Sequence, residues 1–206
     1  MKYKKYFRKT SLKQPGIGDL FLEEIKNKNP KTFLEIGVFH GVTARNVCEL
    51  LYKNHDKEFR YVGVDIFDQD IKYKNEGVPI YKFKNPLKNF YFKYIKKQNP
   101  YSLEAVTELL IKFKNNIEII KGNSNHVLKN LKNRNFDFIF IDGGHAYETA
   151  MNDLILSKEI LSPGGTILCD DYDLWHLGAK KAIDKFVQNE KCNLSIVSER
   201  FAKIEF

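Results

Sequence analysis

Cysteine is scarce in this chain, and long apolar runs are absent. The 206 residues include three cysteines, Cys48, Cys169 and Cys192, and none of them stands in a C-x-x-C spacing. An odd number without that spacing argues against a disulfide framework or a zinc site and is typical of reduced thiols in a cytoplasmic protein. No stretch approaches the roughly 20 consecutive apolar residues that a membrane-spanning helix needs. The basic N-terminal stretch MKYKKYFRKTSLKQ is followed by no apolar segment, so a secretory signal is not expected.

The chain also lacks the two common glycine-rich phosphate-binding motifs. In FLEIGVFHGVT, Gly37 and Gly41 flank a turn from a strand into a helix, but Phe39 stands where G-x-G-x-x-G has its middle glycine. The Lys-Ser/Thr pair of a P-loop is missing as well. These absences weaken the case for an NAD site and argue against a nucleoside triphosphate site. The glycines that are present still let backbone N–H groups approach a ligand closely.

The composition is otherwise that of a soluble globular protein. Hydrophobic residues make up 43% and charged residues 29% of the chain, and its length suits one domain with a full core. The formal net charge of +8 is compatible with nucleic acid, an anionic membrane or an acidic small molecule as a partner. However, the excess lies in lysines that are spread along the chain. We therefore interpret it as a general feature of the composition and expect neither a membrane nor a nucleic acid as partner.

Short apolar runs alternate with helical periods along the chain, which predicts βαβ units and a parallel sheet. We expect an α/β fold with a doubly wound, Rossmann-like sheet that is mostly parallel and ends in a C-terminal antiparallel hairpin. The predicted strands are 31–38, 60–66, 116–121, 135–142 and 165–170, and the hairpin strands are 193–198 and 201–206.

Apolar residues three and four positions apart predict three helices. Their apolar faces are Ala44, Val47, Cys48 and Leu51 in the first, Tyr147, Met151, Leu154 and Ile155 in the second, and Ala179, Ala182, Ile183, Phe186 and Val187 in the third. The second helix is expected to end before LSPGG, which is a strong stop signal.

Residues 67–101 break this alternation. The segment is rich in Lys, Tyr, Phe and Asn, has no clean period and is too long for an ordinary connection between a strand and a helix. We treat residues 1–206 as a single domain in which 67–101 is an insertion that serves as a lid or a substrate wall. A solvated surface excursion is the alternative. Exposed aromatic residues in this segment would also suit a contact in a homo-oligomer.

Acidic residues stand at the ends of four predicted strands. They are Glu35, Asp65, Asp142 and Asp170, with Asp171 beside the last. In a doubly wound sheet, ligands bind outside the carboxyl ends of the strands, near the point where the strand order reverses. An acid before the glycine turn would repel a pyrophosphate, whereas an acid at the end of the second strand suits ribose hydroxyls. The combination favours a nucleoside that is not an anionic dinucleotide, such as S-adenosylmethionine.

Several motifs, in their order along the chain, resemble those of class I S-adenosylmethionine-dependent methyltransferases. They are LEIGVFHG, GVDIF, GNSNHVL, FDFIFIDGGHAY and LSPGGTILCDDYD. More narrowly, DGGHxY followed by CDDYD and GAKKAIDKF resembles the macrocin O-methyltransferase family, which methylates sugar hydroxyls on natural products. The resemblance covers about residues 31–190 and implies the class I methyltransferase fold. For the methyl donor it implies Glu35, Gly37 and Gly41 at the methionine end, Asp65 at the ribose, and Asn123, Ser124 and Asp142 as further binding residues, the first two beside the adenine.

Asp142, Asp170 and Asp171 match the magnesium ligands of that family, and strand geometry supports the same interpretation. In the usual strand order, the strands that end at Asp142 and Asp170 are neighbours about 4.8 Å apart, so their carboxylates converge. Converging carboxylates need a counter-charge, which a hard divalent cation such as Mg²⁺ supplies. The alternative is that one aspartate caps the following segment while the other is solvated.

His145, in D-x-x-H, matches a general base proposed for the family, and Asp142 joins it in the predicted catalytic pair. The unperturbed pKa of histidine lies near neutrality and suits proton abstraction, although a helix cap is the structural alternative. His176 is a weaker second candidate beside the metal motif. His40, inside the glycine turn, is expected to shape the donor pocket. Strand alternation turns Cys169 to the opposite face of the sheet and into the core.

These patterns predict a Mg²⁺-dependent O-methyltransferase that moves the methyl group of S-adenosylmethionine to a hydroxyl of a small molecule, with a sugar or glycoside preferred. Lysines in the insertion, among them Lys82, Lys84 and Lys88, favour an anionic acceptor. One alternative keeps the fold but changes the reaction to a hydroxylation. An oxygen-activating iron site typically uses two histidines and one carboxylate as ligands, whereas the candidate metal ligands here are mostly carboxylates. The other alternative is a protein that binds or modifies nucleic acid, whose affinity would fall steeply with salt.

Overall fold

The computed structural model of the chain describes residues 8–67, 83–173 and 175–206. Within these ranges, seven strands form one sheet in the order β3-β2-β1-β4-β5-β7-β6. The strands are β1 Thr32–Ile36, β2 Arg60–Asp65, β3 Ile117–Lys121, β4 Phe136–Ile141, β5 Leu161–Cys169, β6 Asn193–Val197 and β7 Phe201–Glu205. Strands β1 to β5 pair in parallel, whereas β7 pairs antiparallel with both β5 and β6. The predicted doubly wound sheet with a C-terminal antiparallel hairpin is confirmed.

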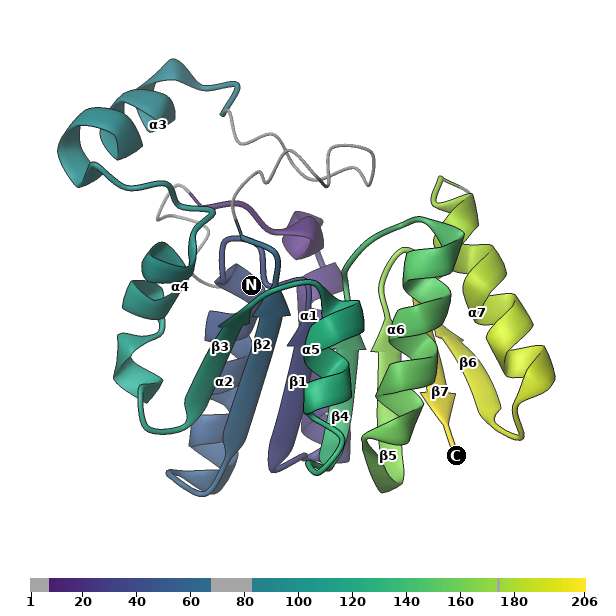
Figure 1. The fold of residues 1–206 in the computed structure, drawn as a ribbon. Helices are drawn as coiled ribbons and strands as arrows, with labels where there is room; N and C mark the ends of the chain where they lie inside the picture. Colours follow the sequence, from purple (N-terminus) through teal and green to yellow (C-terminus); the bar gives the residue numbers. More distant parts are fainter. Residues whose placement is uncertain (1–7, 68–82, 174) are drawn as a thin grey trace.

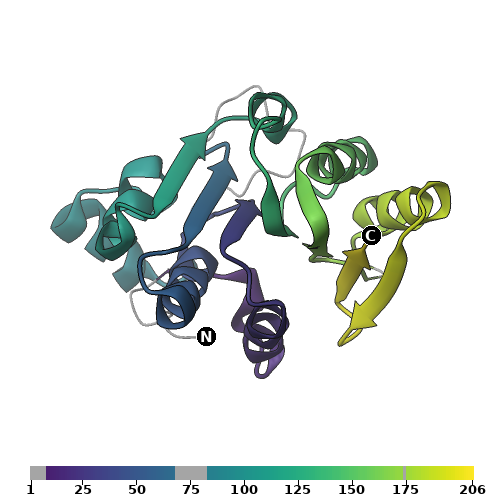
Figure 2. The ribbon, with the colours of Figure 1, turned by 90° about the horizontal axis from the view of Figure 1, so that it is seen from below.

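Helices cover both faces of the sheet (Figure 1, Figure 2). One face carries α1 (Ile17–Lys28), α2 (Val42–His55) and α4 (Leu103–Leu109), and the other carries α5 (Ser124–Asn130), α6 (Tyr147–Glu159) and α7 (Leu177–Asn189). Each face has its own hydrophobic cluster because neighbouring strand residues point to opposite faces, so Phe33 belongs to one cluster and Leu34 to the other. Two short helical turns, η2 (Ser11–Lys13) and η5 (Ile111–Phe113), complete the connections. In the part of the chain that the structure describes, no helix is both long enough and apolar enough to cross a bilayer.

The predicted helix faces agree with the structure in α2 and α7 and differ in α6. All four predicted residues of α2 are buried, and in α7 four of five are, with Val187 partly buried against the same cluster. In α6, Tyr147 and Ile155 are exposed, while Ala150 and Ser157 are buried beside Leu154. The predicted face is half right: Leu154 is buried and Met151 packs against the core, but Ala150, Leu156 and Ser157 are buried in place of Tyr147 and Ile155.

The described part of the insertion, residues 83–101, extends outward above the β3 edge of the sheet (Figure 1). It contains α3 (Pro86–Phe90) and a wide helical turn, η4 (Tyr91–Lys96). Its exposed apolar side chains are Leu87, Phe90, Tyr94 and Ile95. Residues 68–82, with Lys82 among them, lie outside the described ranges. A single domain with a lid, and a homo-oligomer, therefore stay predictions.

Candidate functional site

An open cavity of about 1080 Å³ lies at the carboxyl ends of the parallel strands. It is lined by residues from the ends of β1, β2 and β4, the start of α5 and the segment before α7. The strand order reverses between β1 and β4, which are neighbours in the sheet. Doubly wound sheets bind their ligands at this reversal. The cavity therefore lies where the acidic strand ends led us to expect a site.

The turn after β1 brings that strand end very close to Asp142. Gly37 has a φ of +94°, and a Cβ at this position would lie 2.0 Å from the backbone oxygen of Asp142. Only glycine fits there. Gly37 lines the cavity. Gly41 stands at the start of α2, and a Cβ on Gly41 would lie 3.0 Å from the side chain of Val106. Gly41 is not among the described residues that line the cavity.

Asp65, the residue expected to hold a ribose, ends β2 and lines the cavity. Its carboxylate accepts hydrogen bonds from the backbone N–H of Phe39 at 2.7 Å and of Phe67 at 3.0 Å. The hydroxyl of Tyr101 donates a third hydrogen bond at 2.8 Å. Burial raises the pKa of Asp65, although the hydrogen bonds act in the opposite direction. These donors hold the carboxylate in one orientation at the cavity wall.

Asn123 and Ser124, expected beside the adenine, line the cavity at the start of α5. Glu35 is placed differently. Its side chain is fully buried in β1 and accepts a hydrogen bond from the hydroxyl of Tyr61 at 2.5 Å. Desolvation raises the pKa of Glu35 to about 8. Because strand alternation turns this side chain into the core, Glu35 is not among the described residues that line the cavity, and the structure does not bring it to a bound donor.

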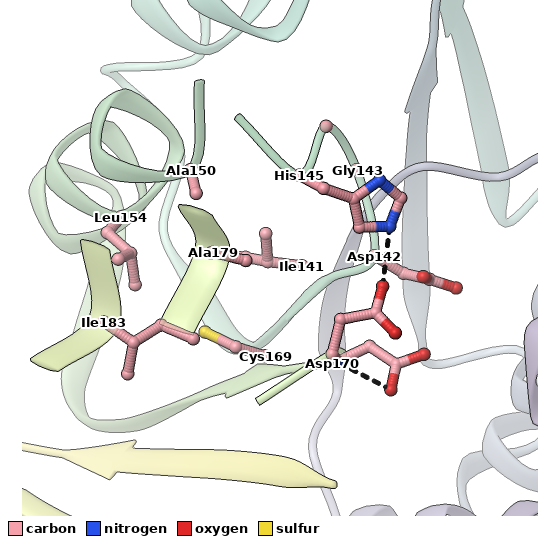
Figure 3. Close-up of a pocket in the computed structure, with 12 residues that line it drawn as sticks. Ile141, Asp142, Gly143, His145, Ala150, Leu154, Cys169, Asp170, Ala179 and Ile183 are labelled. Carbon is pink, nitrogen blue, oxygen red and sulfur yellow. Dashed lines mark hydrogen bonds and ion pairs between the residues drawn. The ribbon is translucent and has the colours of Figure 1, made fainter. Parts of the chain in front are cut away.

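Asp142 and the pair Asp170 and Asp171 come together at the ends of β4 and β5. These strands are paired, and the backbone N–H of Asp170 donates to the backbone oxygen of Ile141 at 2.9 Å. One ligand oxygen from each aspartate lies within 4.8 Å of the others. Figure 3 shows the acidic groups and His145 on one side of the strand ends and apolar side chains on the other. The predicted convergence of these carboxylates is confirmed.

Two partners of the acid cluster were missed by the sequence reasoning. Ser11 donates a hydrogen bond to Asp142 at 2.8 Å, and burial raises the pKa of Asp142, which Asp170 and Asp171 raise further. Arg200 donates from Nε and Nη2 to the two oxygens of Asp170, both at 2.6 Å. Arg200 lies in the turn before β7, and β7 runs antiparallel to β5, so that turn meets the carboxyl end of β5. The C-terminal antiparallel hairpin that we predicted from the sequence could therefore have indicated that Arg200 lies near Asp170.

A second group of side chains surrounds Asp171. Nε2 of His145 lies 2.7 Å from Oδ2 of Asp171, and Nδ1 of His176 lies 3.4 Å from Oδ1. The two imidazole rings stack with their centroids 4.6 Å apart. The hydrogen bond to Asp171 raises the pKa of His145. His176 is therefore a full member of the site, and the sequence reasoning did not foresee two histidines around one carboxylate.

A much smaller cavity of about 20 Å³ lies behind these acids, among apolar residues of β4, β5, α6 and α7 (Figure 3). Cys169 lines it and is buried in the core, as predicted from strand alternation. Burial raises the pKa of its thiol, which keeps the sulfur neutral. Cys169 is therefore not a nucleophile of this site.

Basic side chains line the large cavity from the N-terminal segment and from the insertion. They are Arg8, Lys9, Lys13, Lys84 and Lys88. The ammonium groups of Lys9 and Lys88 lie 5.3 Å and 5.4 Å from the ring centre of Phe83. Burial, together with the charges of Arg8, Lys9 and Lys88, lowers the pKa of the buried His40 to about 3. The cavity thus has a positively charged region in addition to its acidic one.

The strand order, the glycine turn and the acidic strand ends define the class I methyltransferase fold. A family model described as a methyltransferase domain matches residues 34–172, and the chain belongs to that family. A search of curated protein sequences gives no match. The narrower likeness to macrocin O-methyltransferases stays a prediction.

Solved structures share this fold over nearly the whole chain. An O-methyltransferase from Bacillus cereus in complex with SAH is 13% identical, with 98% of this chain and 84% of that chain covered and a TM-score of 0.60. CalS11, a TDP-rhamnose 3'-O-methyltransferase of calicheamicin biosynthesis, is 16% identical over 95% of this chain and 81% of that chain, with a TM-score of 0.62. Cofactor-bound Rv0187 from MTB is 14% identical, with 98% of this chain and 84% of that chain covered and a TM-score of 0.66.

Proposed function

We propose that this chain transfers the methyl group of S-adenosylmethionine to a hydroxyl group of a small molecule, and that the acceptor is a sugar or a glycoside. The observation that carries the proposal is the placement of His145 and Asp171 in the strand-end cavity, beside Asp142. A base held by a carboxylate suits the removal of a proton from a hydroxyl group. Membership of the methyltransferase-domain family supports S-adenosylmethionine as the methyl donor.

The donor would bind in the part of the cavity formed by β1, β2 and α5. There Asp65 takes the ribose hydroxyls, as acids at the end of the second strand do in doubly wound folds. Gly37, which has no Cβ, lets the turn after β1 lie directly against the backbone of Asp142 in this wall of the cavity. Asn123 and Ser124, which line the cavity at the start of α5, would bind the adenine base.

His145 is positioned to take the acceptor proton. In this proposal the carboxylate of Asp171 accepts the 2.7 Å hydrogen bond, so Nε2 of His145 carries the hydrogen and Nδ1 carries the lone pair. In the transfer step, the acceptor oxygen forms a bond to the methyl carbon while the carbon–sulfur bond breaks and its electron pair goes to sulfur. The hydroxyl proton passes to Nδ1 of His145. Positioning of the two reactants supplies much of the rate enhancement in such a step.

The acid cluster fits Mg²⁺ by its donor atoms and by its charge. Carboxylate oxygens are ligands that Mg²⁺ prefers. Arg200 balances the charge of Asp170, whereas Asp142 and Asp171 have no cationic side chain bound to both of their oxygens among the described contacts. Burial raises the pKa of Asp142, the charges of Asp170 and Asp171 raise it further, and a bound cation would favour its ionised form. Held by Asp142, Asp170 and Asp171, the ion would lower the pKa of an acceptor hydroxyl. The Mg²⁺ dependence is part of this proposal, as is a cytoplasmic location.

An anionic sugar is the acceptor class that the cavity favours. Lys84 and Lys88 line it from the insertion, and Lys9 lines it from the N-terminal segment. Trp175 also lines it and is 90% exposed, which leaves a flat apolar face of the kind that packs against a sugar ring. CalS11 is named for a nucleotide-linked sugar, TDP-rhamnose. Nucleotide-linked sugars are therefore the acceptors to test first.

Calorimetric titration of S-adenosylhomocysteine tests the donor site. We expect micromolar binding to the wild type and binding about 10-fold weaker to Asp65→Asn, because a hydrogen-bonded charge is lost. The control is Glu23→Gln, which changes an exposed acid of α1 and should leave the affinity unchanged. Failure of the wild type to bind would contradict the proposed function.

The transfer itself is tested with S-adenosylmethionine labelled in its methyl group. Free sugars and nucleotide-linked sugars serve as acceptors, each with Mg²⁺ and with a chelator. We expect the nucleotide-linked sugars to become labelled in the presence of Mg²⁺ and to stay unlabelled when the chelator is added. Equal transfer with the chelator would remove Mg²⁺ from the proposal and leave His145 as the base.

A further inference from the structure

We infer that His145, Asp171 and His176 form a binding site for a borderline first-row divalent cation such as Zn²⁺, which shares only Asp171 with the acid cluster that suits Mg²⁺. Each of the three residues offers one ligand atom, and these atoms lie within 4.8 Å of one another. Two nitrogens and one carboxylate oxygen suit Zn²⁺, Co²⁺, Ni²⁺ or Fe²⁺. Mg²⁺ and Ca²⁺ prefer oxygen ligands alone.

The ring nitrogens already face the same carboxylate. Nε2 of His145 lies 2.7 Å from one oxygen of Asp171, and Nδ1 of His176 lies 3.4 Å from the other. Ligands around a tetrahedral Zn²⁺ at about 2.0 Å are about 3.3 Å apart, so a small movement of one ring makes room for the ion. Oδ1 of Asp173 lies 3.0 Å from Nδ1 of His176 and helps to hold that ring in place.

The backbone is shaped to hold these side chains together. Gly178 lies in the first turn of α7, and a Cβ there would lie 2.4 Å from the backbone oxygen of His145. The absence of that Cβ lets the start of α7, with His176, approach the turn that carries His145. Asp171 has a φ of +59°, a left-handed conformation that residues other than glycine adopt rarely. Strained backbone of this kind is concentrated at functional sites.

The site is open to the large cavity, so a cation can enter from solvent. All three residues line that cavity. The side chains of His145 and His176 are 47% and 34% exposed, whereas Asp171 is 13% exposed. An ion held there would keep a coordination position towards the cavity, as ions with three protein ligands do.

A bound cation would also control the base. When Nε2 of His145 coordinates a metal, the ring proton resides on Nδ1, and that nitrogen can no longer accept the acceptor proton. We therefore expect Zn²⁺ to inhibit methyl transfer. This consequence alone rests on the proposed function, because cation binding itself needs no methyl donor.

Calorimetric titration of Zn²⁺ into the protein, without methyl donor or Mg²⁺, tests the site. We expect one equivalent to bind the wild type with a micromolar or tighter Kd, and to bind His176→Ala at least about 30-fold more weakly. His176 makes no side-chain cap to α7, so this variant should fold, which its melting temperature checks. His126→Ala removes an exposed histidine of α5 and Asp142→Asn removes a ligand of the acid cluster. Both should bind Zn²⁺ within about 3-fold of the wild type.

Three outcomes would overturn the inference. They are weak or no binding to the wild type, unchanged binding to His176→Ala, and a loss in Asp142→Asn alone, which would place Zn²⁺ in the acid cluster. Absorption by bound Co²⁺ gives a second readout, since the visible bands of the wild type should be lost in His176→Ala. Zinc binding without binding of S-adenosylhomocysteine would refute the proposed function and leave this inference intact. Binding of S-adenosylhomocysteine without zinc binding would refute this inference and leave the proposed function intact.

Discussion

The two halves of the sheet both end in acidic residues, but those residues have different partners. At the ends of β1 and β2, Glu35 and Asp65 accept hydrogen bonds from neutral groups, namely tyrosine hydroxyls and backbone N–H groups. At the end of β5, Asp170 faces the guanidinium of Arg200 and Asp171 faces the imidazole of His145. The acids of both halves stand at the carboxyl ends of strands, but the side chains that surround their carboxylates differ.

Under the proposed function, this difference would separate donor binding from reaction. Neutral donors fix the carboxylate of Asp65 at the cavity wall, which suits recognition of ligand hydroxyls, whereas burial raises the pKa of Glu35 to about 8 and keeps that group neutral. Charged and titratable partners favour the ionised carboxylate and place an imidazole where a proton can move. The contrast also shows that a strand-end acid is not by itself a site residue. Glu35 fits the same sequence pattern as Asp65, yet its side chain lies in the core.

The largest expected effect is on catalysis in the β4–β5 half. We expect His145→Ala to lower kcat by about 10²- to 10⁴-fold, because the general base is lost, and to leave the KM for S-adenosylmethionine unchanged. Initial rates of methyl transfer measure both constants. His126→Ala, at an exposed histidine, is the control and should match the wild type. A kcat of His145→Ala within a few-fold of the wild type would assign the base elsewhere.

The next effect is on stability. Arg200→Met leaves the carboxylate of Asp170, which is fully buried, without its cation, so we expect a loss of about 3 to 5 kcal/mol in the free energy of unfolding. Arg60→Met breaks a pair with Glu118 whose side chains are 44% and 42% exposed, and should lose at most about 1 kcal/mol. Urea unfolding of both variants measures the difference. Equal losses would show that the Arg200 pair is no more than a surface contact.

In the β1–β2 half, the expected effect depends on pH. Folded protein holds the proton of Glu35 up to about pH 8, whereas its ordinary pKa is 4.5, so wild-type stability should fall as pH rises between these values. Gln at position 35 in Glu35→Gln cannot ionise. Between pH 5 and pH 8, the free energy of unfolding of this variant should therefore fall by on the order of 3 kcal/mol less than that of the wild type. Urea unfolding across this range measures it, with Glu23→Gln as the exposed control. Parallel pH profiles for Glu35→Gln and the wild type would contradict the burial of a neutral Glu35.

The smallest effect should come from the basic rim, outside both halves. We expect Lys84→Gln with Lys88→Gln to raise the KM for an anionic acceptor by about 3- to 10-fold, because partly exposed charges contribute weakly. The matched control is Lys53→Gln with Lys114→Gln, which removes the same charge from exposed positions that do not line the cavity. An unchanged KM in the rim variant would remove the anionic acceptor from the proposed function.

Much of the fold could be predicted because it depends on local patterns. The alternation of apolar runs with helical periods located all seven strands, and the usual strand order, in which β4 and β5 are neighbours, then predicted that Asp142 and Asp170 converge. The face of α6 was misassigned in part because that helix buries small and polar residues, Ala150, Asp153 and Ser157, which a hydrophobicity pattern does not count. Arg200 and Ser11 were missed because each reaches the acids from a distant segment of the chain.

The sequence by itself determined where the strands lie along the chain, the acidic strand ends and the methyltransferase family, since these depend on residue type and spacing along the chain. Only the tertiary structure decided which acids reach the cavity and what faces them. Strand direction placed Arg200 beside Asp170, side-chain alternation sent Glu35 into the core, and the missing Cβ of Gly178 let His176 approach His145. The physical reason is that charge pairing, burial and metal-ligand geometry depend on distances between segments that sequence spacing does not specify.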